Sequence, residues 1–184
     1  MAGRAPRADA VRNRARVLEV AAEVFATEGL SVPVQEIARR AGVGTGTVSR
    51  HFPTKLDLFQ AILLAKMEEL TRQGEVLAAQ HDPGTAFLEL FATMVRAGAT
   101  HQGLAEALGG AGFDLDALAA QAGCDLNGEV RGLLEQAQRA GTIRADVTHA
   151  DVKALMNGCL TRGGTADELT PIIAVVCDGL RTDK

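Results

Sequence analysis

The stretch VQEIARRAGVGTGTV, residues 34–48, decides the fold. Its apolar positions Ile37 and Ala38 can pack two short helices together, and Gly42 supplies the backbone freedom that a tight turn between them needs. The second helix, expected over 45–51, presents short polar side chains and an arginine. A helix of this size fits the major groove of DNA. The stretch therefore predicts a helix-turn-helix, although a turn of this kind alone would also suit an ordinary helical hairpin.

Apolar residues keep the 3.6-residue period of amphipathic helices along the rest of the chain. We expect helices over about 11–28, 34–41, 45–51, 54–80, 84–100, 114–122, 126–140, 149–162 and 166–181. No convincing strand pair or hairpin turn interrupts them. The sequence predicts an all-α protein.

Local signals set three of the helix boundaries. Thr54 to Asp57 has the Ser/Thr-x-x-acid form of a capping box, which should start the long helix. The four glycines within 103–112 indicate a short helix and a flexible connection. For the last helix two starts are open: a box beginning at Thr165, or Pro171 in the first turn after Thr170.

Charge is distributed unevenly. The net charge is -4, yet residues 1–52 contain eight arginines against five acidic residues, and the remainder has an acidic excess. A basic N-terminal end is typical of proteins that bind a polyanion. Chance clustering on a solvated surface explains the charge equally well when charge is considered alone.

Residues 10–64 resemble the DNA-binding domain of the TetR family of bacterial transcriptional regulators. The matching features, in chain order, are Ala21-Ala22-x-x-Phe25, Glu28-Gly29, Ile37-Ala38, Ala41-Gly42-Val43, Gly46-Thr47, His51-Phe52-Pro53-x-Lys55 and Leu58-Phe59. The resemblance implies an N-terminal three-helix DNA-binding domain and a C-terminal helical domain for ligand binding and dimerisation. We accordingly assign 1–9 to a flexible basic arm, 10–53 to the helix-turn-helix domain, and 54–184 to the effector-binding and dimerisation domain.

The candidate DNA-binding residues are Gln35, Thr45, Thr47, Ser49, Arg50, His51 and Lys55. We expect the two threonines to position the recognition helix or touch base edges. Arg50 would read guanine or hold a phosphate, while His51 and Lys55 would hold the DNA backbone. Two positions depart from the family: Gly44 replaces a usual Ser or Thr, and Ser49 replaces an aromatic residue, generally Tyr.

The resemblance also implies an effector cavity in the C-terminal domain. Its candidate residues are Met67, Phe87, Phe91, Met94, His101, Phe113, Met156, Asn157 and Cys159, although the same apolar stripes fit a plain hydrophobic core. Residues about 149–181 should pair two subunits, unless a monomer buries both stripes internally. We then expect a homodimeric repressor that binds a palindromic double-stranded DNA operator and is released by a small apolar or amphipathic effector.

Several other functions are disfavoured. Ser31 and Ser49 are the only serines and neither lies in a GxSxG turn, and no phosphate-binding glycine loop or HExxH is present, so we predict no enzyme, cofactor or metal site. The three cysteines lack metal spacing, and no apolar run could cross a membrane, which favours the cytoplasm. The alternative is a helical interaction module whose basic end binds a partner protein or a membrane surface; steep salt dependence without sequence preference would identify it.

Overall fold

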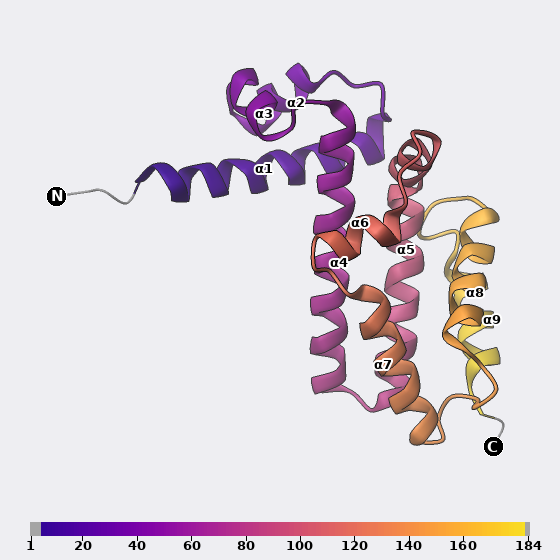
Figure 1. Cartoon of the computed structure of the whole chain (residues 1–184). Helices are drawn as coiled ribbons and strands as arrows, with labels where there is room; N and C mark the ends of the chain where they lie inside the picture. The colour runs from indigo at the N-terminus through magenta and orange to yellow at the C-terminus, as the bar shows by residue number, and fades with distance from the viewer. Residues whose placement is uncertain (1–4, 183–184) are drawn as a thin grey trace. The chain divides into compact units, whose positions relative to one another are not determined.

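The computed structural model describes residues 5–182, which form nine α-helices and no β-strand (Figure 1). The helices are α1 (Ala5–Glu28), α2 (Val34–Ala41), α3 (Thr45–His51), α4 (Lys55–Gln80), α5 (Pro83–Gly110), α6 (Leu115–Gln121), α7 (Leu126–Arg139), α8 (His149–Thr161) and α9 (Thr170–Leu180). The predicted all-α class is confirmed. Within 5–182, no helix combines the length and hydropathy that a membrane span requires.

The first helix begins earlier than its apolar stripe suggested. Residues 5–9 of the segment assigned to a basic arm belong to α1, and residues 1–4 lie outside the described residues.

The chain divides into two compact units. Unit 1 consists of Met1–Ala65 and Gly103–Leu115, and unit 2 consists of Lys66–Gln102 and Asp116–Lys184.

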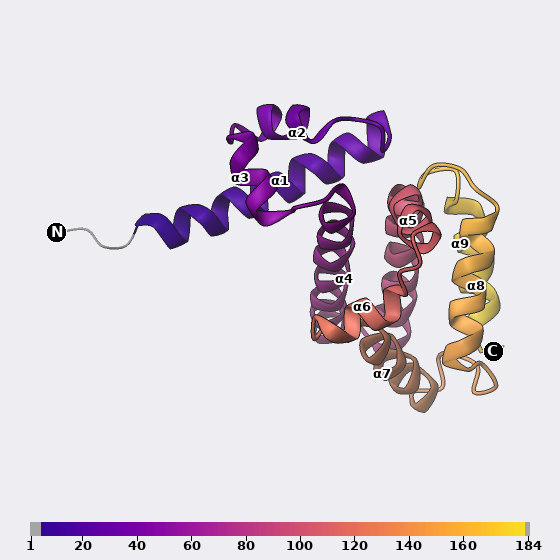
Figure 2. The same ribbon diagram turned by 45° about the horizontal axis from the view of Figure 1, so that its top comes forward.

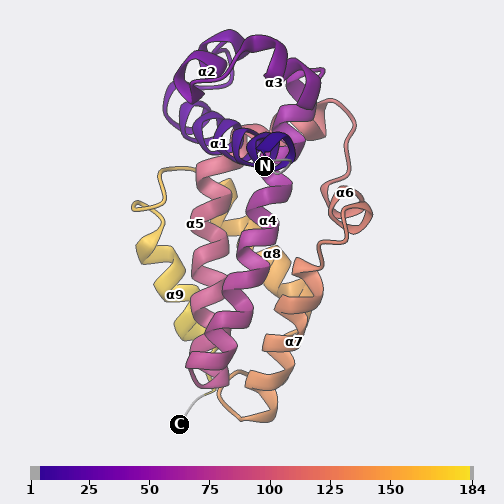
Figure 3. The same cartoon turned by 90° about the vertical axis from the view of Figure 1, so that its left-hand side faces the viewer.

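Unit 1 is a small bundle in which α2 and α3 lie on the same side of α1 (Figures 1 and 3). Its core forms around Phe25 of α1 and Phe59 of α4, whose rings meet edge to face with centroids 5.0 Å apart. Ile37 of α2 and Val48 of α3 are completely buried in the same cluster. Burial of these two side chains attaches the short helices to the longer ones.

Unit 2 is a helical bundle in which α4 and α5 run antiparallel and α8 lies beside α9 (Figures 1 and 2). Phe87 and Phe91 of α5 and Leu133 of α7 lie in its core. Gly98 allows α5 to approach α8 closely, because a Cβ at this position would lie 2.9 Å from a methyl group of Leu160. The core therefore depends on a small residue at this helix crossing.

The helix α5 is longer than predicted. We expected it to end near Thr100 and to be followed by a flexible connection over 103–112, but it continues to Gly110. Leu104 and Leu108 are four residues apart and both are buried in the core of unit 1. Their burial outweighs the low helix propensity of the glycines around them.

The capping box at the start of α4 is confirmed. The backbone N–H of Thr54 donates to the Asp57 carboxylate at 2.8 Å, and the Asp57 N–H donates to the Thr54 hydroxyl at 3.1 Å. Thr165 makes the equivalent bond, its N–H donating to Glu168 at 2.8 Å, but it caps a turn. The last helix begins at Thr170, because Pro171 lacks an N–H and fits only the first turn.

Gly42 and Gly46 provide a matched test of this fold. Gly42 has φ +67°, in the left-handed region, so we expect Gly42→Ala to lower the free energy of unfolding by about 1–2 kcal/mol. Gly46 lies within α3 with open space around its Cβ position, so Gly46→Ala should raise it by about 0.5–1 kcal/mol. Urea unfolding followed by circular dichroism measures both, and shifts of the same sign would contradict the assignment.

Candidate nucleic-acid interface and ligand pocket

The turn between α2 and α3 aims the second helix. After α2, the N–H of Val43 donates to the carbonyl of Ala38 at 3.0 Å, and Gly42 takes the left-handed conformation that lets the chain reverse. Ala38 is 1% exposed where the helices approach, so no larger side chain fits there. Only Val48 of α3 is buried. The remaining surface of α3 is thereby available for binding.

Six of the seven candidate DNA-binding residues lie on these two helices. Gln35, Thr45, Ser49, Arg50 and His51 are exposed, and Thr47 is partly buried. Their side chains are hydroxyls, an amide, a guanidinium and an imidazole, all of which can bond phosphate oxygens or base edges. These six groups lie on two successive short helices of unit 1.

The other arginines near this surface are held by carboxylates. Arg39 donates to Glu36 at 2.7 and 2.8 Å, and Arg40 donates to both Glu36 and Glu28. Hydrogen bonds from Arg39 and then Arg40 lower the pKa of Glu36 from 4.5 to about 2. Arg50, in contrast, has no ion pair or hydrogen bond within the described part of the chain. Arg50 is therefore the cation of α3 that is free to meet an anion.

Lys55 is placed differently from the other six candidates. Its ammonium donates to the carbonyl of Val32 at 2.8 Å and lies 5.4 Å from the centre of the Phe25 ring and 6.0 Å from that of Phe59. Burial lowers the pKa of Lys55. These contacts connect the segment before α2 to α1 and α4. Lys55 thus has a structural role inside unit 1, whatever contact it makes with DNA.

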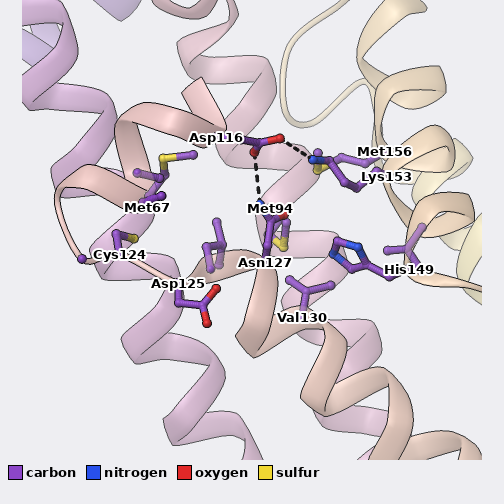
Figure 4. Close-up of a pocket in the computed structure, with 15 residues that line it drawn as sticks. Met67, Met94, Asp116, Cys124, Asp125, Asn127, Val130, His149, Lys153 and Met156 are labelled. Carbon is purple, nitrogen blue, oxygen red and sulfur yellow. Dashed lines mark hydrogen bonds and ion pairs between the residues drawn. The ribbon is translucent and has the colours of Figure 1, made fainter. Parts of the chain in front are cut away.

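A pocket of about 370 Å³ lies within unit 2, near the lower end of the range for ligand sites (Figure 4). Met67 of α4, Met94 of α5 and Met156 of α8 supply much of its wall, together with Val130 of α7. Cys124, in the segment between α6 and α7, lies beside Met67 in the close-up. The wall is therefore mainly flexible and polarisable.

Polar side chains meet on one side of this pocket. The Asp116 carboxylate of α6 accepts a hydrogen bond from Lys153 of α8 at 2.7 Å and from Asn127 of α7 at 3.1 Å (Figure 4). Hydrogen bonding from Lys153 is the main cause of the lowered pKa of Asp116. One carboxylate therefore connects three helices.

His149 lies next to this group, at the first residue of α8. Thr148 and Asp151 cap the helix there with a reciprocal capping box. Burial, followed by the charges of Arg131 and Lys153, lowers the pKa of His149, and the charge of Asp116 opposes this shift, so the environment favours the neutral ring. Its Nε2 atom is buried and has no hydrogen-bond partner within residues 5–182.

The candidate effector residues separate into three groups. Met67, Met94 and Met156 line the pocket. Phe87, Phe91 and Cys159 lie in the core of unit 2 and do not line the pocket. The third group, which also does not line the pocket, is His101, Phe113 and Asn157. Phe113, in unit 1, and Asn157 are exposed, and His101 is partly buried with its Nδ1 unpartnered in the described chain.

Sequence reasoning missed Asp116, Asn127, His149 and Lys153. These residues come from three successive helices, and the bonded pairs are 11 and 37 positions apart, so no local motif links them. The polar residue at the start of α8 was visible, but nothing in the sequence showed that its ring faces a pocket.

Comparison with known proteins identifies the family. Residues 17–62 match the family described as bacterial regulatory proteins, tetR family, and residues 82–182, more than half of the chain, match the transcriptional regulator SbtR-like C-terminal domain. The chain belongs to the TetR family of transcriptional regulators. It is therefore a DNA-binding regulator of transcription, and the resemblance noted in residues 10–64 is confirmed. Dimerisation and response to small ligands are typical of TetR regulators.

Solved structures and curated relatives agree with this assignment. A TetR regulatory protein from Mycobacterium vanbaalenii is 46% identical, with a TM-score of 0.76, and the match covers 96% of this chain and 99% of that one. The TetR regulator SCO0520 from Streptomyces coelicolor is 28% identical, with a TM-score of 0.76 over 93% of this chain and 99% of that chain. The regulator SrpR of Pseudomonas putida is 41% identical over 64 residues, which are 34% of this chain and only 30% of SrpR.

The contacts of Lys55 lead to a prediction that separates its structural role from DNA binding. We expect Lys55→Met to lower the free energy of unfolding by about 1 kcal/mol in the absence of DNA, because the Val32 carbonyl loses its donor. Arg72→Met, which removes an exposed cation from the same helix, should change it far less. Urea unfolding measures both. Unchanged stability of Lys55→Met would mean that the ammonium contributes through DNA contacts alone.

Proposed function

We propose that this TetR regulator is a repressor that binds a palindromic operator as a homodimer and is released by a small apolar or amphipathic effector. The observation that carries the proposal is the presence of two separate binding features in one chain. The exposed polar face of α3 suits DNA, and the largely apolar pocket of unit 2 suits a small molecule.

On this proposal α3 enters the major groove. Thr45, Thr47 and Ser49 supply short donors, and the unpaired guanidinium of Arg50 reads a guanine or holds a phosphate. His51 and Gln35 bond the DNA backbone from either side of this group. Residues 10–53 then carry DNA recognition, while residues 54–184 bind the effector and dimerise.

Dimerisation would use α8 and α9. Leu155 of α8 is 36% exposed and Val175 of α9 is 71% exposed, and Ala154 and Ala174 beside them are also exposed. A second subunit would cover these apolar side chains by forming a four-helix interface. Two recognition helices held about 34–36 Å apart would then read two half-sites of a palindrome.

Release of the operator would be a population shift. An effector that binds more tightly to a conformation with mismatched recognition helices lowers the affinity for DNA. A hundredfold loss of operator affinity requires a difference of about 2.7 kcal/mol in effector binding between the two conformations.

Selection from a randomised duplex pool tests DNA recognition. At physiological salt and with competitor DNA present, we expect one palindromic sequence to be enriched and Arg50→Ala to weaken binding to it by about tenfold or more. Arg139→Ala, an exposed arginine of α7, serves as the matched control and should bind as the unmodified protein does. A folded protein that enriches no sequence, and binds every duplex alike, would contradict the proposal and favour the interaction module.

Charge at the proposed interface tests dimerisation. We expect Leu155→Glu with Val175→Glu to convert the dimer into a folded monomer, because two subunits would bury four unpaired carboxylates. Val76→Glu changes an exposed valine of α4 and should leave the dimer intact. Sedimentation velocity measures the mass. If the double variant remains a dimer, the interface does not lie on α8 and α9.

A further inference from the structure

The pocket wall favours a compact, apolar body. Three methionine side chains from α4, α5 and α8 line the space (Figure 4), and Val130 and Ala119 also line it. Thioether groups adapt to the shape of a ligand and make favourable contacts with the edges of aromatic rings. The volume of about 370 Å³ limits the ligand to a small molecule.

His149 is the polar group of the pocket that lacks a partner. Its ring is directed into the pocket in the close-up, and its Nε2 is buried without a hydrogen bond inside the described chain. A buried polar atom in this state gains a full hydrogen bond when the ring turns toward the space and a ligand supplies the missing group. In the neutral ring, which the lowered pKa favours, Nε2 either accepts or donates a hydrogen bond, depending on the tautomer. A hydroxyl group can satisfy both tautomers.

The charges that line the pocket disfavour an ionic ligand. Lys153 already donates to Asp116, and the carboxylate of Asp125 accepts from the backbone N–H of Gly128 at 2.9 Å. A carboxylate ligand would therefore find two acidic groups and no unpaired cation. An ammonium ligand would find the Asp116 carboxylate already bonded to Lys153 and Asn127, and it would lose its hydration against the methionines. A neutral molecule avoids both costs.

We propose that the effector is a small neutral hydroxyl compound with a flat aromatic body, and that its hydroxyl group hydrogen-bonds to His149 Nε2. This inference rests on the proposed function in one respect, because it takes the pocket of unit 2 as the effector site. It makes His149 a residue that determines specificity for the hydroxyl group and assigns the apolar body to Met67, Met94 and Met156.

Four probes with the same ring system test the inference: 2-naphthol, naphthalene, naphthalene-2-carboxylate and 2-naphthylmethylammonium. Calorimetric titration of the full-length protein should show that 2-naphthol binds about tenfold or more tightly than each of the others. In His149→Phe, 2-naphthol and naphthalene should bind within about twofold of each other, because the partner of the hydroxyl group is gone. His149→Gln, which keeps a polar group at this position, should restore part of the preference, and the exposed His81→Phe should behave as the unmodified protein.

Three results would overturn the inference: tighter binding of the carboxylate or ammonium probe, a hydroxyl preference that survives in His149→Phe, or no binding of any probe to folded protein. If the His149 variants fail to fold, nitrogen-15 NMR of the unmodified protein decides, since 2-naphthol must shift the Nε2 resonance of His149.

The operator assay tests the proposed function separately from the ligand inference. If the probes bind through His149 but leave operator affinity unchanged, the proposal of effector release is wrong and the ligand inference stands. If the protein binds its operator normally but binds no probe, the ligand inference is wrong and the proposal of DNA binding stands.

Discussion

The proposed recognition helix, α3, depends on burial of one side chain, Val48. A seven-residue helix is not stable by itself in water, so α3 exists because Val48 is completely buried against the core of unit 1. The left-handed backbone of Gly42 and the small side chain of Ala38 then determine where α3 can lie relative to α2. Every group that α3 presents to solvent is positioned by this packing, so the proposed DNA recognition and the stability of unit 1 would rest on the same residues.

Internal hydrogen bonds decide which cations of unit 1 remain available to DNA. Glu28 and Glu36 hold Arg40, and Glu36 also holds Arg39, while the Val32 carbonyl holds the ammonium of Lys55. Since a cation bonded to its own protein must exchange that partner before it binds a phosphate, these groups contribute less to DNA affinity than their formal charge suggests. The basic character of residues 1–52 is therefore a poor measure of the binding surface. The unpaired guanidinium of Arg50 is a better one.

Sequence reasoning succeeded where the signal was local and failed where distant helices meet. The turn at Gly42 and the capping box at Thr54 depend on residues that are close in the chain, and both were predicted. The glycines after Thr100 suggested a loop, because the sequence does not show that Leu104 and Leu108 are buried in unit 1. For the pocket, the three methionines were predicted from their helical stripes. Asp116, Asn127, His149 and Lys153 were missed because they meet only once α6, α7 and α8 have packed together.

The path of the chain limits how a ligand in unit 2 can influence unit 1. The chain passes between the units after Ala65 and after Gln102, which lie inside α4 and α5, and after Leu115, which is the first residue of α6. A helix transmits a displacement along its axis better than a loop does, because each backbone carbonyl is bonded to the next turn. The third crossing is adjacent to the pocket, since Asp116 follows Leu115 directly and bonds Lys153 and Asn127. On the proposed function, a ligand that changes the partners of Asp116 would act on α6 at the residue where the chain enters unit 2.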